Sequence, residues 1–520
     1  MLSVLYRRRL RQGLEELQLK RNRLLLVWSM LLSAIFIGLA SKSSPLYPLN
    51  DWVDVNYFFS MGRFIVDGMV PYRDLYEHKG PVLYFVFAII ALFSRESYVG
   101  VYLLEVVTYG LFLFYSGLIA QLYLDKTRII YLLIAIIAAL LPMSWSFTHG
   151  GSVEQHCLFI LAYALYSFLR AMQENRALSA KEAIINGVFA GIMLWIKYTM
   201  LGFYLGLALF VIVWYFSTKQ TWKQLLLTIG HFFIGIAAVS FVVFLYFAIN
   251  GALSDLFNCY FYDNIVRYPS VVEGSRFAKI FECLKGAFKN NPSYAWMLRL
   301  GIVWLVWNIY PYWRTGLMLA ISFLGLTLGT YWGCKGWDYY GFIFAAYSVF
   351  GLIGITQLLR FWHLRELYQK IVKGSPIPFY AALVITVALL VNSAVNNNRN
   401  MYMTKYDQDE TVQYRFAKII QTVEDPTLLN YGFLDGGFFY ASGAKPADRY
   451  FSYTNISPNE MWQSQKECIE NGEADFIVTR KYPLSNYTPD SSQYQLVDQM
   501  EFPFSKTTRF TYYLYQKITD

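Results

Sequence analysis

The chain has 520 residues, of which 56% are hydrophobic, 19% aromatic and only 15% charged. Together with a mean hydropathy of +0.34, this composition excludes an ordinary soluble domain and indicates a polytopic membrane protein. In such a protein the formal charge of +9 is first of all an orientation signal, so we expect no nucleic-acid partner.

Apolar runs long enough to cross a bilayer recur from residue 24 to residue 395. The basic amphipathic stretch before them is too polar for a signal-peptide core, so we expect the first run to be an uncleaved span with its N-terminus inside. About eleven spans are then predicted, at residues 24–42, 98–124, 129–147, 157–173, 183–197, 199–216, 225–249, 296–310, 315–331, 341–359 and 377–395. With this assignment the inside connections are net basic.

One apolar run decides this topology. Residues 80–93, GPVLYFVFAIIALF, are too few for a span and are predicted to form an interfacial or re-entrant helix. If this run crossed the bilayer, every later loop would change sides and the basic loops would face outward. An odd number of spans also places the polar C-terminal region on the same side as residues 51–85.

The polar region indicates a second domain. We expect an all-α polytopic membrane domain at residues 1–395 and a small extracytoplasmic α/β domain at residues 396–520. Strand-like runs occur at 428–434, 474–480 and 508–516, and a helical pattern at 410–423. The five cysteines form no CxxC pair, and only Cys468 lies in the second domain, so we expect no disulfide within it and no thiol chemistry.

The segment after the first span is unusually rich in charge. In DVNYFFSMGRFIVDG, residues 54–68, apolar and polar side chains occupy different helical faces, which predicts an amphipathic helix in the outer interface. Asp51 and Asp54 lie at its start, where carboxylates cap free amides, and for Asp51 this is the preferred interpretation. The following loop, GMVPYRDLYEHKGP, supplies Arg73, Asp74, Glu77, His78 and Lys79. Charges at a membrane edge are often only solvated, but charges of both signs at this density favour a site.

Three further outer loops carry similar side chains. They are SWSFTHGGSVEQH with His149, Glu154 and His156, residues 250–295 with Tyr260, Tyr262, Arg267 and Tyr268, and GCKGWDYYG with Lys335, Trp337, Asp338, Tyr339 and Tyr340. All four loops therefore bring carboxylates, cations and aromatic rings to one shared opening on the outer face of the membrane domain. Two histidines and one carboxylate are a weak ligand pattern, so a divalent metal is possible but no cofactor is expected.

A sugar carried on a lipid phosphate is a suitable substrate for an opening lined by such side chains. The phosphate leaves without a proton, so the transfer needs one base for the acceptor hydroxyl and cations for the phosphate, whereas a glycoside hydrolase also needs an acid. One Asp with Lys and Arg is enough, because cations act strongly beside a low-dielectric membrane.

The sequence resembles the GT-C superfamily of polyprenyl-phosphate-sugar-dependent glycosyltransferases. The resemblance rests on DVNYFFSMGR followed by GMVPYRDLYEHKGP, which is similar to a family pattern of an acidic pair, Gly-Arg, G-x-x-P-Y-x-D and an acidic residue near Lys-x-Pro. The superfamily includes protein O-mannosyltransferases, the lipid A aminoarabinose transferase and, more similar to this chain, bacterial cell-surface polysaccharide transferases. The resemblance implies that Asp54 is the base and Lys79 a cation near the lipid phosphate, and Glu154 falls where relatives carry an acidic residue.

The sequence departs from the family pattern at two places. Val55 replaces the second acidic residue of the pair, which argues against metal bridging and makes Asp51 a second candidate base. Asp338 and Tyr339 stand where the family often has His-Tyr before a late span, which leaves the role of Asp338 open.

The main hypothesis is an integral-membrane hexosyl- or pentosyltransferase of the cytoplasmic (plasma) membrane. It would move a sugar from a polyprenyl-phosphate donor to a hydroxyl of a cell-envelope acceptor (polysaccharide, teichoic acid, lipid or protein), with inversion. We assign Asp54, Glu154 and Asp51 to catalysis, Lys79, Arg267, Arg73, Glu77 and His78 to the donor, and Trp337, Asp338, Tyr339 and His149 to sugar or acceptor contacts.

Three alternatives stay open: a lipid-linked sugar flippase, a polymerase or ligase that uses a lipid diphosphate, and a non-catalytic glycan sensor. A flippase predicts charges near the bilayer midplane. Most ionisable residues here lie in outer loops, with Glu105 and Lys197 as the main exceptions.

Overall fold

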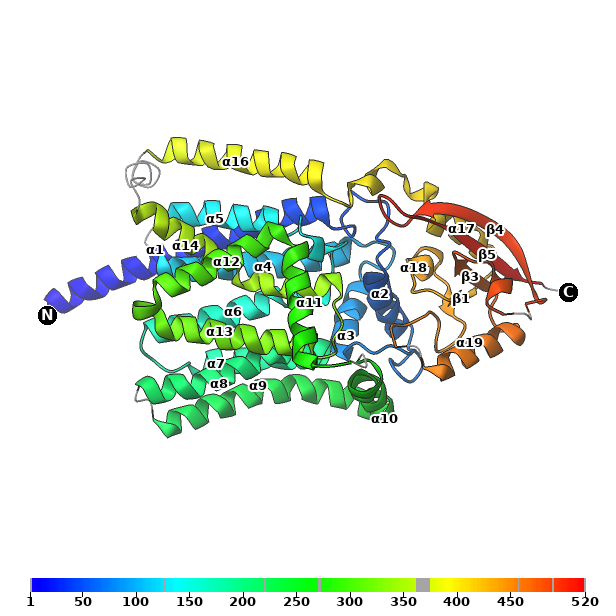
Figure 1. Cartoon of the computed structure of the whole chain (residues 1–520), viewed down its shortest axis with the longest axis horizontal. Helices are drawn as coiled ribbons and strands as arrows, with labels where there is room; N and C mark the ends of the chain where they lie inside the picture. The colour runs from blue at the N-terminus through cyan, green and yellow to red at the C-terminus, as the bar shows by residue number, and fades with distance from the viewer. Residues whose placement is uncertain are drawn as a thin grey trace.

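The computed structural model describes residues 2–124, 127–218, 221–269, 273–361, 375–456, 458–488 and 491–518. Long helices run side by side in a bundle, and a small domain with a β-sheet covers one end of it (Figure 1). The N-terminus lies at the opposite end of the bundle from this domain (Figure 1).

The bundle is built from the predicted apolar runs. Its helices are α1 (Leu2–Ala40), α4 (Val99–Tyr123), α5 (Thr127–Leu140), α6 (Val153–Gln173), α7 (Ala180–Lys197), α8 (Gly202–Thr218), α9 (Trp222–Ile249), α12 (Pro292–Trp307), α13 (Ile309–Tyr331), α14 (Ser348–Phe361) and α16 (Pro376–Asn397). A 3-10 helix, η4 (Asp338–Tyr347), leads into α14, and shorter 3-10 helices η1 (Trp145–Phe147) and η2 (Tyr198–Leu201) precede α6 and α8. Each run predicted as a span therefore coincides with a helix.

Six helical stretches of the described residues are long and apolar enough to cross a membrane. They are Glu16–Ala40, Val99–Tyr123, Ala180–Thr218, Trp222–Ile249, Asp338–Leu359 and Ile377–Asn397. The chain is a multi-pass membrane protein, and the number of about eleven spans stays a prediction.

Two short helices lie between the bundle and the C-terminal domain (Figure 1). They are α2 (Val53–Val66) and α3 (Pro81–Ala91), which come from the charged segment and the short apolar run. Residues 54–64 of α2 are all buried, so the helix is covered on both faces. On the side of the C-terminal domain, Arg63 donates hydrogen bonds of 3.1 Å to the carbonyls of Phe439 and Tyr440. The predicted helix is confirmed, and the C-terminal domain covers the face that carries Arg63. Its placement in the outer membrane interface stays a prediction.

The long outer loop after α9 also forms helices. It contains α10 (Leu253–Leu256), the π-helix η3 (Phe257–Arg267) and α11 (Arg276–Asn290), and α11 runs across the side of the bundle (Figure 1). Single π-helical turns are rare and occur often at functional sites.

The C-terminal domain is a small α/β unit. Its strands are β1 (Thr427–Tyr431), β2 (Lys445–Pro446), β3 (Phe476–Arg480), β4 (Tyr494–Pro503) and β5 (Arg509–Lys517), and its helices are η5 (Met401–Lys405), η6 (Gln408–Glu410), α17 (Val412–Ile420), α18 (Phe438–Ser442), α19 (Asn459–Glu470) and η7 (Leu484–Asn486). The sheet order is β2-β1-β3-β5-β4, with β1, β2 and β3 parallel and β5 antiparallel to β3 and β4. The three predicted strands and the predicted helix are confirmed as β1, β3, β5 and α17.

One hydrophobic core extends from the bundle into this domain. It includes Tyr109 and Leu165 in the bundle, Phe58 in α2, and Phe416 and Leu428 in the C-terminal domain. A continuous core fixes α2 and the loops at the end of the bundle relative to the sheet. The boundary predicted at residue 396 stays a prediction.

Candidate active site

The first element of the site is a carboxylate beside a lysine. Asp54, in the first turn of α2, places Oδ2 at 3.7 Å from Lys79 Nζ, in the loop before α3. Only 10% of the Asp54 side chain and 11% of the Lys79 side chain is exposed. The structure therefore brings together the two residues that the family resemblance selected as base and phosphate cation.

Hydrogen bonds to side chains of the same segment fix the backbone of the loop that carries Lys79. The Glu77 carboxylate accepts hydrogen bonds from the Lys79 amide, at 2.6 Å, and from the Tyr84 hydroxyl. Its other oxygen lies 3.2 Å from Nδ1 of His78, and Tyr72 donates to the Lys79 carbonyl at 2.5 Å. Glu77 thus shapes the backbone that presents Lys79.

Charges in this loop are set by burial and by their neighbours. Burial by itself raises the pKa of Glu77, but His78, Lys79 and the Tyr84 hydrogen bond lower it by more, so the pKa is below its ordinary value. Burial lowers the pKa of Lys79, yet Asp54 and Glu77 raise it by more, so Lys79 stays a cation. Burial lowers the pKa of His78, which favours its neutral form.

A second buried pair lies beside the first. Glu154, fully buried in the first turn of α6, contacts Lys197 Nζ at 2.5 Å, and Ser152 caps the helix by accepting from the Gln155 amide. The Lys197 ammonium lies 3.4 Å from the ring centroid of Tyr340 and 5.7 Å from that of Tyr339. The sequence analysis did not assign Lys197 to the site. The feature that could have indicated it is a single lysine at the end of an apolar helix.

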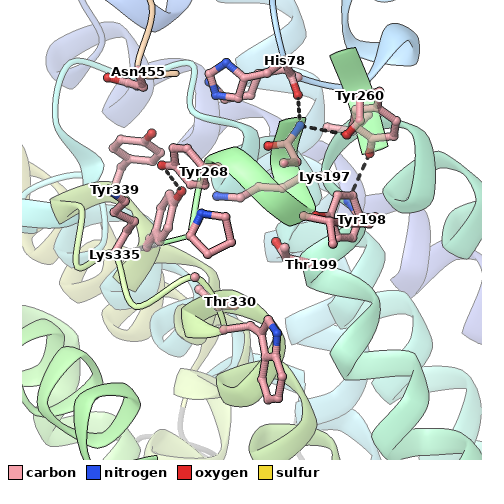
Figure 2. A pocket seen from close by; sticks show the side chains of 18 residues that line it. His78, Lys197, Tyr198, Thr199, Tyr260, Tyr268, Thr330, Lys335, Tyr339 and Asn455 are labelled. Carbon is pink, nitrogen blue, oxygen red and sulfur yellow. Dashed lines mark hydrogen bonds between the residues drawn. The ribbon is translucent and has the colours of Figure 1, made fainter. Parts of the chain in front are cut away.

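Both lysines open into one cavity of ≈ 210 Å³ (Figure 2). Its lining contributes cations from Lys79, Lys197 and Lys335, and His78 beside them. None of the described residues that line it is Asp or Glu. The cavity is therefore an electropositive chamber, and an anion is the ligand that its charge favours.

Aromatic and hydroxyl side chains complete the cavity wall. In Figure 2, Tyr268, Tyr339 and Lys335 lie on one side and Tyr198, Tyr260 and Thr199 on the other, while Asn455 comes from the C-terminal domain. The hydroxyls of Thr199 and Thr330 are buried without a hydrogen-bond partner among the described residues. Buried hydroxyls usually find a partner, so these two favour a polar ligand in the cavity.

The two arginines predicted to bind the donor lie outside the cavity. Arg267 is 3.3 Å from Asp263 and 3.5 Å from Glu460, and Arg73 pairs with Asp74 at 2.8 Å. Neither arginine is among the residues that line the cavity, and both have carboxylate partners. Their predicted contact with the donor stays a prediction without support from this geometry.

Asp51 does not cap α2. Trp52 is the N-cap residue and no side chain caps it, while Asp51 forms a buried ion pair with Lys42 at 2.6 Å. The preferred interpretation of Asp51 is therefore wrong, because Lys42, just after α1, provides a stronger partner than the helix amides. Burial lowers the pKa of Lys42, while Asp51 opposes this effect.

Two of the four remaining predicted contact residues lie against Trp52. The His149 ring stacks on Trp52 with centroids 6.0 Å apart, and Tyr339 meets Trp52 edge to face at 5.6 Å. Trp337 is 43% exposed and donates to the Tyr268 hydroxyl, and Asp338 uses its carbonyl to accept from Ser146. Tyr339 is thus the member of this set that reaches the cavity.

The described residues contain no group of three or more His, Cys, Asp or Glu side chains placed to hold a metal ion. His149 stacks on Trp52, whereas Nδ1 of His156 lies 3.2 Å from the Thr108 hydroxyl. The two histidines of the second loop therefore have separate partners.

Comparison with solved structures defines the class of fold. No protein-family model and no curated protein matches the chain. The structure nevertheless has the GT-C fold, as the sequence resemblance implied.

The matching structures include the lipid A aminoarabinose transferase ArnT from Cupriavidus metallidurans. ArnT bound to undecaprenyl phosphate gives a TM-score of 0.55 at 14% identity, and apo ArnT gives 0.53 at 14%, each covering 94% of this chain and 97% of ArnT. The apo oligosaccharyltransferase of Archaeoglobus fulgidus gives 0.48 at 13% identity, covering 88% of this chain and 69% of the other.

Proposed function

We propose that the protein is an integral-membrane glycosyltransferase that moves a sugar from a polyprenyl-phosphate donor to a hydroxyl of a cell-envelope acceptor, with inversion. The observation that carries this proposal is the cavity lined by three lysines and no carboxylate, which Lys79 joins to Asp54. ArnT, which shares the fold, was crystallised with undecaprenyl phosphate.

In this proposal the lysines of the cavity hold the lipid phosphate. Lys79, Lys197 and Lys335 offer three ammonium groups, and the hydroxyls of Thr199 and Thr330 offer further donors. Donors fixed in a buried site stabilise the charge that develops on the departing phosphate more strongly than water does. We assign the phosphate to these lysines rather than to Arg73 and Arg267, because the lysines line the cavity and the two arginines do not.

The reaction needs one base and no acid. Asp54 accepts the proton of the acceptor hydroxyl as its oxygen attacks the anomeric carbon of the donor sugar. The bond from that carbon to the phosphate oxygen breaks, and its electron pair leaves with the phosphate. Lys79 lies against Asp54 and in the cavity wall, so the same ammonium pairs with the base and steadies the leaving group. Glu154 acts through Lys197, because it holds the Lys197 ammonium in the cavity wall.

Transport receives less support from the structure. The two ionisable residues that stood out within apolar runs both have local partners: Lys197 pairs with Glu154, and the Glu105 carboxylate accepts from Ser41 and Gln155. Glu105 lies in the second turn of α4 and Lys197 at the end of α7, so neither is near the middle of a long helix.

The orientation is proposed from the ends of the helices. Glu154 begins α6 and Lys197 ends α7, so the basic connection between these helices lies at the far end of the bundle from the site. Since basic connections stay inside, the site and the C-terminal domain lie outside the plasma membrane, and the N-terminus lies inside.

The test uses purified protein in lipid, radiolabelled polyprenyl-phosphate sugars and a cell-envelope extract as acceptor. We expect loss of label from the lipid with one monophosphate donor, and a fall of about a hundredfold or more with Asp54→Asn. Asp67→Asn, an exposed carboxylate paired with Arg95, is the matched control. Unchanged transfer by Asp54→Asn rejects the base, and use of diphosphate donors alone favours the polymerase or ligase class. If no donor is consumed, the transferase fails and a flipping assay tests the transporter.

A further inference from the structure

A second and larger cavity, of ≈ 460 Å³, lies between the membrane domain and the C-terminal domain. Its wall comes from residues 42–48 after α1, residues 96–99 at the start of α4, Thr404, residues 406–408 and Tyr414, and Tyr440 of α18. It shares no lining residue with the electropositive chamber. The end of α1 and the start of the C-terminal domain meet at this end of the bundle (Figure 1). It is therefore a separate cavity, formed only because the two domains meet.

The wall of this second cavity combines aromatic rings with hydrogen-bonding groups. It contains five tyrosines, which are Tyr47, Tyr98, Tyr406, Tyr414 and Tyr440. Tyr98 and Tyr440 are buried with ring centroids 4.0 Å apart, whereas Tyr406 and Tyr414 are partly exposed. The surface that faces the cavity is mainly polar, and tyrosine hydroxyls both donate and accept hydrogen bonds.

The charge of the wall differs from that of the chamber. Glu96 and Asp407 are exposed carboxylates, and Gln408 adds an amide. Lys42 is the cation among its lining residues, and Asp51 already pairs with it at 2.6 Å. The cavity is therefore net negative, which disfavours anionic glycans and suits hydroxyl groups that donate to carboxylates.

Two contacts join this cavity to the helix that carries Asp54. Lys42 pairs with Asp51, and Tyr98 donates its hydroxyl to Asn56 at 2.5 Å. Asp51 and Asn56 stand on either side of Asp54 in the chain. A ligand in the second cavity therefore lies against the side of α2 that leads to the base.

We propose that this cavity is a glycan-binding subsite for an uncharged part of the acceptor, distant from the sugar that receives the new bond. The identity of the glycan as acceptor rests on the proposed function, but the binding itself does not. The hydroxyls of Tyr406 and Tyr414 donate and accept hydrogen bonds, and Glu96, Asp407 and Gln408 accept or exchange hydrogen bonds with sugar hydroxyls.

The test measures binding of soluble pentasaccharides to the full chain in lipid nanodiscs by saturation-transfer NMR. The probes are maltopentaose, mannopentaose, chitopentaose and, as the anionic comparison, pentagalacturonate. We expect at least one uncharged probe to bind, Tyr414→Ala and Glu96→Gln each to weaken it about tenfold, and pentagalacturonate to bind far less. Tyr482→Ala and Glu424→Gln, exposed residues of the C-terminal domain outside the cavity, are matched controls and should bind as wild type.

Three results would overturn the subsite. They are no binding by any uncharged probe, binding that neither Tyr414→Ala nor Glu96→Gln weakens, and tighter binding of pentagalacturonate. Because no donor is present, the result is separate from the transfer assay. Glycan binding without any donor consumption supports the subsite and rejects the transferase, whereas donor consumption without glycan binding does the reverse.

Discussion

The site is built from two buried carboxylate–lysine pairs, Asp54 with Lys79 and Glu154 with Lys197. Each lysine neutralises its carboxylate and also reaches the cavity wall. Removing one partner of such a buried pair leaves the other charge without compensation. The same residues therefore contribute to stability and, in the proposed function, to donor binding, and experiments must separate the two contributions.

Lys335 is the residue at which donor binding can best be measured apart from stability. It lines the cavity, contacts the Tyr268 ring at 5.4 Å and has no carboxylate within ion-pair distance among the described residues. Lys335→Met should raise the KM for the lipid donor about tenfold, the worth of one hydrogen bond to a charged group, with an unchanged melting temperature. Lys285→Met, on the exposed face of α11, is the control. A donor KM equal to wild type would remove Lys335 from the phosphate site.

Glu154 and Lys197 predict a coupled effect on stability. Glu154→Gln leaves the ammonium of Lys197 buried and unpaired, and should destabilise the protein by about 3 kcal/mol. The double variant Glu154→Gln with Lys197→Met removes both charges and should recover part of this loss. Thermal unfolding in nanodiscs measures the cycle, and additive effects of the two substitutions would contradict the pairing.

His149 makes stability depend on pH. Burial, with Lys42 and Arg399 nearby, lowers its pKa well below the usual 6.5, so the folded chain keeps it neutral. As the pH falls below about 6.5, the unfolded chain binds a proton that the folded chain does not, and stability is lost. His149→Phe keeps a ring against Trp52 and should lose less melting temperature than wild type between pH 7.5 and 5.5. Equal losses in both proteins, or the same gain from the control His231→Phe, would reject this assignment.

For single residues, the sequence motif identified which side chains belong to the site, but it did not show which of them form ion pairs. Asp54 and Lys79 both lie in the segment that resembles the GT-C pattern, so their proximity could be foreseen. Lys197 meets Glu154 only because α6 and α7 are antiparallel neighbours, and Lys42 reaches Asp51 only through the turn after α1. Such pairings depend on packing, which a single sequence does not display.

Among the elements, the crossing of α2 and α3 positions Asp54, the proposed base. Gly62 lies at this crossing, where an added Cβ would be 2.5 Å from the carbonyl carbon of Phe87 in α3. Backbone atoms cannot yield as a side-chain tip does, so any larger residue must push the helices apart. The closeness of this crossing fixes the direction in which α2 presents Asp54.

Gly62→Ala should therefore destabilise the protein by about 2 kcal/mol and lower transfer along with it. Gly230→Ala in α9 is the matched control, because an added Cβ there meets no atom within 4 Å. In that helix alanine is the better helix former, so stability should stay or rise slightly. Equal melting temperatures for Gly62→Ala and wild type would show that the helices can separate without loss.

Apolar elements were predictable, and polar ones were not. The bundle helices follow from hydropathy and β1, β3 and β5 from their apolar runs, whereas β4 was missed because seven of its ten residues are exposed or partly exposed and include Asp498 and Glu501. Helix α2 was predicted, but its burial was not, since the covering residues lie far along the chain.

In the whole molecule, the C-terminal domain covers the helix that carries the base. Arg63 of α2 donates to the carbonyls of Phe439 and Tyr440, and Asn455 reaches the cavity wall. The two domains therefore share one core and both cavities, and the membrane domain alone would leave α2 without its cover.

Arg63→Met should loosen this cover, because it removes both hydrogen bonds while keeping much of the apolar stem. Amides of α2 should then exchange with deuterium about tenfold faster. Arg415→Met is the matched control, since its pair with Asp498 is an exposed one on the domain surface and should contribute little. Exchange in α2 that equals wild type would show that the cover does not depend on Arg63.

The cover over α2 also sets an order of events during biosynthesis. Helix α2 comes from residues 53–66, but the backbone groups that engage Arg63 come from residues 439 and 440. Translation and membrane insertion of all the intervening helices must be complete before this contact can form, and contacts between such distant residues form late. A newly inserted chain therefore acquires its finished site last, so the proposed transfer from a membrane lipid cannot begin before synthesis of the chain is nearly complete.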